Sequence, residues 1–177
     1  MTKQEIVARL TENHLLFKEA ISRLTEKEFT TAPEGKWTPG QHFQHIILSV
    51  SPVVTAFRLP LFILKFFFGQ ANRPSRSYEG LVKRYEEKLA LGGRASARFV
   101  PQQVSYSQQQ SLLKKYDRVV KDLCKLALKT NEMNLDKYIL PHPLLGKLTL
   151  REMLYFSAHH VYHHYNICMK YRVQKEF

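Results

Sequence analysis

The sequence predicts an all-α protein, a four-helix bundle with a long crossover between its second and third helices. Four segments carry apolar residues at helical spacings, and none sustains the alternation of a β-strand. Gly and Pro are sparse, with 7 and 8 copies in 177 residues. Roughly fifty residues separate the second and third segments, whereas antiparallel neighbours need only short loops. We therefore expect a single domain over residues 1–177 with a crossover at about 56–105.

The first two helices are delimited by capping signals. A capping box at Thr2–Glu5 predicts the first start, and a second Thr-x-x-Glu run at Thr25–Glu28 marks where the apolar stripe ends. The second helix is expected to begin with Thr38 as N-cap and Pro39 at the first helical position. Their apolar faces contain Ile6, Leu10, Phe17, Ile21 and Leu24, and then Phe43, Ile46, Ile47, Val50 and Val54.

The crossover and the last two helices follow from the same reasoning. Breakers interrupt the crossover, and a shorter helix is expected inside it over Tyr78–Leu91. The third helix spans roughly Tyr106–Lys129. A third capping box, Thr149–Glu152, opens the fourth helix, which runs to about Tyr171, and this cap is a sufficient explanation for the glutamate.

Composition narrows the class of partner. The chain has 27 Lys and Arg against 15 Asp and Glu, a net charge of +12 that attracts anions. These cations are spread along the chain rather than gathered in a patch or arm, which argues against nucleic-acid binding. Cys124 and Cys168 lie in apolar helical patterns and are too few for a disulfide framework. With no apolar signal core at the start, we expect a cytoplasmic protein.

The apolar stretch Leu59–Gly69 is about half the roughly 20 residues that span a bilayer, and Lys65 interrupts it. We expect it to be buried against the domain or a partner subunit, with Phe62–Phe68 forming a homodimer contact. The alternative is an interfacial membrane anchor, supported by the cations Arg58, Lys65, Arg73 and Arg76.

The motif HHVYHHYNI places four histidines within six residues of the fourth helix. At 100° per residue, His164 falls inside the apolar arc and His160 at its edge, whereas His163 and His159 lie further out. Two inward histidines at i and i+4 can bind one metal ion. The alternative is one hydrogen-bonded core histidine and one half-exposed histidine.

The second helix carries a further pair, His42 and His45. Periodicity places His42 nearer the apolar face and His45 near the border of the polar face. On the residues alone, either one remains a candidate to face the bundle interior.

These motifs resemble those of the DinB/YfiT-like proteins, a superfamily of metal-binding four-helix bundles. Members carry a Trp-Ser/Thr pair and a histidine eight positions after the tryptophan; here these are Trp37, Thr38 and His45. The resemblance therefore selects His45 over His42. It gives Trp37 no role beyond packing at the entrance of the second helix.

A second anchor of the resemblance lies before and inside the fourth helix. His142-Pro143, Gly146–Thr149 and the run His160–His164 match the family pattern. The implied metal ligands are His45, His160 and His164. Members commonly have Gln where this chain has Ile167. A register of His159 and His163 with Asn166 would restore that match, but it would turn the pair away from the apolar arc.

The resemblance implies an open metal site, because three neutral imidazoles leave a coordination position free on Zn, Ni or Fe. It further implies a hydrolase or a low-molecular-weight-thiol S-transferase acting on a small molecule, and the basic charge suits an anionic thiol. His163, next to a proposed ligand, is a candidate to support that ligand or to act as a proton shuttle, and the alternative is a solvated helix residue. The alternatives are a non-catalytic metal-binding or stress-response bundle and a protein bound at a membrane surface.

Overall fold

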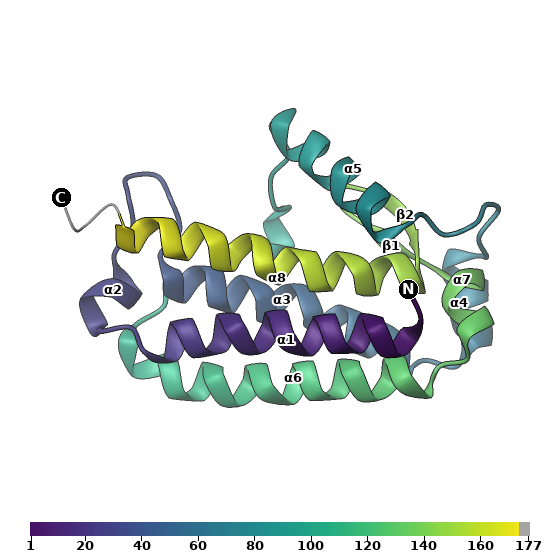
Figure 1. Ribbon diagram of the computed structural model, residues 1–177, viewed down its shortest axis with the longest axis horizontal. Helices are drawn as coiled ribbons and strands as arrows, with labels where there is room; N and C mark the ends of the chain where they lie inside the picture. Colours follow the sequence, from purple (N-terminus) through teal and green to yellow (C-terminus); the bar gives the residue numbers. More distant parts are fainter. Residues whose placement is uncertain (174–177) are drawn as a thin grey trace.

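The computed structural model describes residues 1–173, with side chains described through Tyr171. Four long helices lie side by side along the molecule (Figure 1), and their inner faces form one hydrophobic core. The predicted all-α four-helix bundle is confirmed. These helices are α1 (Lys3–Ser22), α3 (Pro39–Arg58), α6 (Gln109–Lys129) and α8 (Leu150–Val173).

Side-chain caps set the helix starts, as the sequence predicted. Thr2 and Glu5 form a reciprocal capping box at α1, and Thr38 caps α3 ahead of Pro39. The second Thr-x-x-Glu run does more than mark an end, because Thr25 caps a short helix of its own, α2 (Glu26–Thr30). That helix packs closely on α3 at Gly40, where a Cβ atom would lie 2.6 Å from the ring of Phe29.

The crossover contains more helix than expected. The helix predicted from Tyr78 is present as α5 (Tyr78–Ala90), which lies across the outer side of α8 (Figure 1). An additional helix, α4 (Leu61–Phe68), follows α3 after Pro60. Apart from Lys65 its residues are all apolar, so the run has no periodic phase and periodicity could not reveal it. Two 3₁₀ turns, η1 (Ala97–Phe99) and η2 (Tyr106–Gln108), complete the crossover.

The expectation of no strands was wrong at one place. Between α7 (Glu132–Lys137) and α8, the strands β1 (Ile139–His142) and β2 (Gly146–Thr149) form an antiparallel hairpin. Strands of four residues are too short to show a clear alternation. Gly146 supplies the positive φ of +78° that the turn requires. The hairpin fixes His142 and feeds directly into α8.

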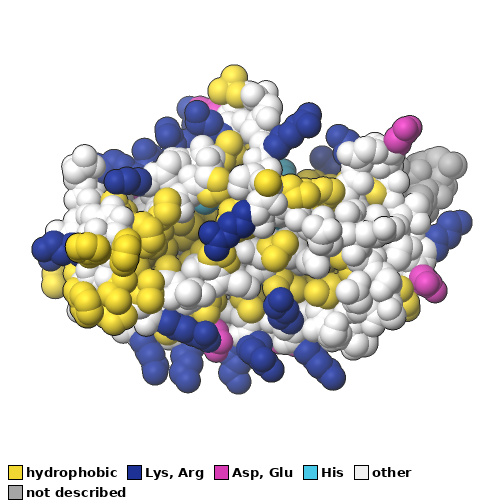
Figure 2. Space-filling model, turned by 180° about the vertical axis from the view of Figure 1, so that it is seen from behind, with side chains coloured by type: hydrophobic (Ala, Val, Ile, Leu, Met, Phe, Trp, Pro, Cys, Tyr) yellow, Lys and Arg dark blue, Asp and Glu magenta, His cyan; other side chains and the backbone are white. Residues whose placement is uncertain are grey.

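The domain does not bury the aromatic side chains of α4. Phe62, Phe66 and Phe67 are 72%, 83% and 69% exposed, and of this helix only Leu64 is buried. Figure 2 shows these apolar side chains gathered over α4, with Lys and Arg side chains around them. Within the described residues no single helix is long and apolar enough to cross a membrane; α3 and α4 pass that test only as a pair bent by 115°.

Candidate metal centre

Three buried histidines from two helices converge inside the bundle. One ring nitrogen from each of His45, His160 and His164 lies within 4.8 Å of the others. The Nε2 atom of His160 is 3.3 Å from Nε2 of His45 and 3.0 Å from Nε2 of His164. Because His160 and His164 are one turn apart on α8, the helix alone brings them together, and α3 adds His45.

The crossover orients His45. Its Nδ1 lies 2.7 Å from the backbone carbonyl oxygen of Phe99, at the end of η1. A carbonyl only accepts, so Nδ1 carries the hydrogen and donates it. In the neutral ring, Nε2 is then the bare lone pair, and it faces the other two histidines.

His42 orients His164. Their Nδ1 atoms are 2.7 Å apart, so one donates and the other accepts. If Nδ1–H of His164 donates, its Nε2 lone pair faces His160, and the Nε2–H of His42 points to the Tyr171 hydroxyl 3.5 Å away. Periodicity was right that His42 lies inward, but it could not show that this ring supports a neighbour.

Burial keeps the cluster neutral. It lowers the pKa of His45, and it lowers the pKa of His160 and His164 far below the ordinary value, with smaller contributions from neighbouring histidines. Neutral imidazole is the form that binds a metal. Nε2 separations of 3.0 and 3.3 Å are close to the edge, about 3.3 Å, of a tetrahedron with metal–nitrogen bonds of 2.0–2.1 Å. The donor set therefore fits a divalent ion such as Zn²⁺.

The two histidines of the alternative register, His159 and His163, do not converge with His45. His159 and His163 are half-buried and turn their edges toward Tyr85, and neither belongs to the converging group. Burial lowers the pKa of His163 to about 4. Its ring faces a cavity beside the cluster, which is compatible with a position near a bound molecule.

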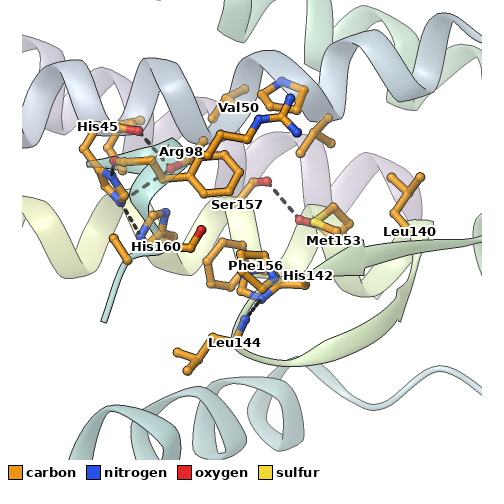
Figure 3. Close-up of a pocket in the computed structure, with 18 of the residues that line it drawn as sticks. His45, Val50, Arg98, Leu140, His142, Leu144, Met153, Phe156, Ser157 and His160 are labelled. Carbon is orange, nitrogen blue, oxygen red and sulfur yellow. Dashed lines mark hydrogen bonds between the residues drawn. The ribbon is translucent and has the colours of Figure 1, made fainter. Parts of the chain in front are cut away.

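The cavity has a volume of about 460 Å³ and extends from the histidines toward the hairpin. Figure 3 shows His45 and His160 at one end, Met153 and Leu140 at the other, and Arg98 alongside Val50 between them. Walls from α3, α5, α8, the hairpin and the η1 segment enclose it. A cavity of this size takes a small molecule.

Two residues of the sequence motifs have roles at this site that sequence reasoning missed. The Nδ1 of His142 accepts hydrogen bonds from the backbone N–H groups of Leu144 and Leu145, so its Nε2 carries the hydrogen. Trp37 does not merely pack at a helix entrance: its ring lies nearly parallel to that of His164, with centroids 6.4 Å apart, and also contacts His45. The signal that could have indicated these roles is that Trp37 and His142 both belong to the motifs that carry the family resemblance.

Glu152 belongs to a separate buried cluster at the start of α8. It forms the predicted cap with Thr149, but both of its oxygens also accept from Arg73, at 2.7 and 2.8 Å, and one pairs with Arg76. The cap alone therefore does not explain this fully buried side chain. No bond joins it to the described histidines.

Comparison with known proteins agrees with this class of structure, a helical bundle whose buried histidines are compatible with metal binding. The family model of the DinB superfamily matches residues 9–168, so the chain belongs to the DinB superfamily. No curated protein sequence matches it. A crystal structure of a conserved protein from Enterococcus faecalis superposes with a TM-score of 0.63 at 15% identity, covering 97% of this chain and 95% of that one. At this identity the likeness shows the fold alone.

Proposed function

We propose that this protein is a metal-dependent enzyme in which His45, His160 and His164 hold a divalent metal, Zn, Ni or Fe. Its reaction is transfer of a low-molecular-weight thiol to an electrophile, or hydrolysis of a small molecule. The observation that carries the proposal is that three inward imidazoles stand in the wall of a cavity of about 460 Å³. With three protein ligands, such a metal supplies Lewis acidity and an open position for the reacting group.

The residues around the cluster suit an anionic small molecule. Arg94 and Arg98 line the cavity, and neither pairs with a carboxylate in the described part of the chain. Ser157 is committed elsewhere, because its hydroxyl donates to the carbonyl of Met153 at 2.9 Å. The two guanidinium groups therefore remain to attract the carboxylates of a thiol cosubstrate.

His163 is the proposed proton acceptor. It lines the cavity next to His164, and no described residue hydrogen-bonds to it. A pKa of about 4 keeps its imidazole neutral near pH 7, so a bare ring nitrogen can relay to solvent, but not retain, the proton released by a thiol or water. His163→Gln should lower kcat while leaving metal content and KM unchanged; a loss of metal would instead place this residue in the structure of the site.

The test of the proposal is metal content measured by plasma mass spectrometry on protein purified under metal-replete conditions. Wild type should hold close to one metal per chain, and His45→Ala, His160→Ala and His164→Ala should each lose it. His159→Ala, the control from the alternative register, should retain it. Wild type without metal, or ligand variants that keep it, would reject the metal site. Retained metal with no turnover of thiols, electrophiles or esters would reject the enzyme and leave a metal-binding bundle.

A further inference from the structure

The cavity is chemically asymmetric along its length. At one end are the three histidines of the cluster. Toward the other end most of the lining is apolar, with Val53, Ala56, Leu59, Phe68, Leu140 and Met153, and its polar members are Thr55 and His142. A small polar thiol and a small electrophile would leave this apolar half unused.

The hydroxyl side chains in this wall have their hydrogen bonds within α3, and Nδ1 of His142 accepts from backbone N–H groups of its own hairpin. On α3, the hydroxyls of Ser49 and Thr55 donate to carbonyls one turn earlier, at 2.8 and 3.1 Å. These hydroxyls therefore offer a ligand little hydrogen bonding, and the wall is suited to methylene groups.

The cavity is also long. Its lining on α3 runs from His45 to Ala56, eleven residues or about 16 Å at 1.5 Å per residue, and Leu59 follows just beyond the end of the helix. The far end is therefore at the C-terminal end of α3, and Phe68, the last residue of α4, is also part of the lining. A length of this order accommodates an extended hydrocarbon chain.

Two arginines of the crossover supply the positive charge of the lining. Arg98 immediately precedes Phe99, whose carbonyl accepts from His45, and its side chain extends toward Val50 (Figure 3). Arg94 lies on the same crossover segment. Both are exposed and pair with no acidic side chain among the residues described. An anionic group would complement them.

We propose that the cavity binds a single-chain amphiphile, an acyl or alkyl chain with an anionic head. The head lies beside Arg98 and the histidine cluster, and the tail runs toward the C-terminal end of α3. This assignment names the substrate class of the proposed enzyme, and it rests on the proposed function for the statement that the head is the reacting end. The binding itself depends on the cavity and not on the metal.

Chain-length dependence in wild-type protein is the first test. The series hexanoate, octanoate, decanoate and dodecanoate is titrated below the micellar concentration of each, by calorimetry and by fluorescence of Trp37, the single tryptophan, which lines the cavity. Burial of each methylene should tighten binding about fourfold, or 0.8 kcal/mol. One-to-one binding that strengthens along the series supports the proposal. Equal affinities, or binding only to micelles or in proportion to added vesicle surface, would overturn it.

Substitution then locates the tail. Ala56→Phe narrows the apolar half, so dodecanoate should bind at least about tenfold more weakly, a loss of roughly two buried methylenes, while hexanoate is unaffected. The control Ala90→Phe adds the same ring at an exposed position on α5 that does not line the cavity. Thermal unfolding by circular dichroism establishes that both variants fold. Equal dodecanoate affinity in the two folded variants would place the tail elsewhere.

The head is located by charge. Dodecanoate should bind more tightly than dodecanol by up to about fivefold, the value of an exposed ion pair of about 1 kcal/mol. The double variant Arg94→Gln/Arg98→Gln should abolish that preference. Lys121→Gln/Lys125→Gln, which removes the same charge from exposed positions on α6, should preserve it. If both double variants lose the preference for dodecanoate equally, the anion is attracted by the net positive charge of the protein and not by Arg94 and Arg98 in particular.

One variant separates this inference from the proposed function. His160→Ala should contain no metal yet bind dodecanoate with the chain-length dependence of wild type. Wild type that holds no metal after metal-replete purification, yet binds the series with chain-length dependence, would reject the proposed enzyme and keep the amphiphile site. A metal-loaded, active wild type whose binding ignores chain length would keep the enzyme and reject the amphiphile.

Discussion

Helix α8 carries two buried polar clusters that differ in how their hydrogen bonds are completed. Near its start, the carboxylate of Glu152 is fully buried and accepts from Arg73, from Arg76 and from backbone N–H groups. Further along, His160 and His164 turn nitrogen atoms toward each other and toward His45 with no acidic side chain in the converging group of the described chain. The first cluster is complete within the chain, whereas the second presents electron pairs to one point.

This difference separates a structural cluster from a binding site. Burial opposes ionisation of Glu152, but hydrogen bonds from Arg73, Arg76 and Thr149 outweigh it and hold the pKa of the carboxyl below its usual value. Burial of the histidines is not offset in this way, so their pKa values fall and the rings stay neutral. Removing one partner from a buried charge cluster destabilises a fold, because it leaves the remaining charge uncompensated, whereas converging neutral donors favour a cation from outside.

The largest expected effect comes from breaking the complete cluster. Glu152→Gln leaves two arginines without their carboxylate, and the free energy of unfolding should fall by about 3 kcal/mol. Urea unfolding at neutral pH measures this loss. Glu132→Gln is the matched control, because that carboxylate is 43% exposed and its ion pair with Arg151 should contribute less than about 1 kcal/mol. Metal content should remain that of wild type in both, and a similar loss of stability in both would contradict the distinction.

The next effect weakens the second cluster without removing a proposed ligand. His42→Phe preserves an aromatic ring beside Trp37 but removes the Nδ1 that pairs with His164. Loss of such an orienting partner should lower metal affinity about tenfold to a hundredfold. Competition with a chromogenic chelator measures the affinity. His159→Phe, outside the converging group, should bind metal like wild type, and unchanged affinity in His42→Phe would show that His164 needs no support.

Much of this arrangement was predictable from local pattern. The helix starts predicted from the boxes at Thr2 and Thr149 were correct because a cap is formed by residues three apart, and the inward placement of His160 and His164 followed from a single helix. The choice of His45 needed a family resemblance, since His42 and His45 are both buried and periodicity cannot say which nitrogen points where. The ion pairs of Glu152 were not predictable, because Arg73 lies 79 residues away in the sequence.

A buried histidine outside the cluster tests whether burial alone produces the acid sensitivity expected of the cluster. His14 of α1 lies outside the site and pairs through Nδ1 with the hydroxyl of Tyr116 at 2.6 Å. Burial lowers its pKa to about 3, from 6.5 in the unfolded chain. Below about pH 6.5 the unfolded state therefore binds a proton that the folded state does not, and stability falls by about 1.4 kcal/mol per pH unit as pH decreases toward 3.

His14→Phe should remove this contribution. Urea unfolding of metal-free protein between about pH 6 and pH 4 should show a slope shallower than that of wild type by about 1.4 kcal/mol per pH unit. At pH 8 His14 is neutral in both the folded and the unfolded state, so the free energies of unfolding of the two proteins differ only by packing. That difference is the reference against which the slopes are compared. Parallel slopes would mean that His14 takes up its proton in the folded state, and the low pKa attributed to burial would be wrong.

The smallest effect on either cluster is expected from a change on the α4 surface. The described side chains of both clusters of α8 come from one chain, so neither cluster should depend on the homodimer that we predict through the exposed Phe62, Phe66 and Phe67. Phe67→Glu places a charge in that apolar contact and should convert a dimer to a monomer by light scattering, with metal content and the effect of Glu152→Gln unchanged. A dimer of unchanged mass would show that the contact lies elsewhere. A monomer that also loses metal would show that the histidine site depends on the second subunit.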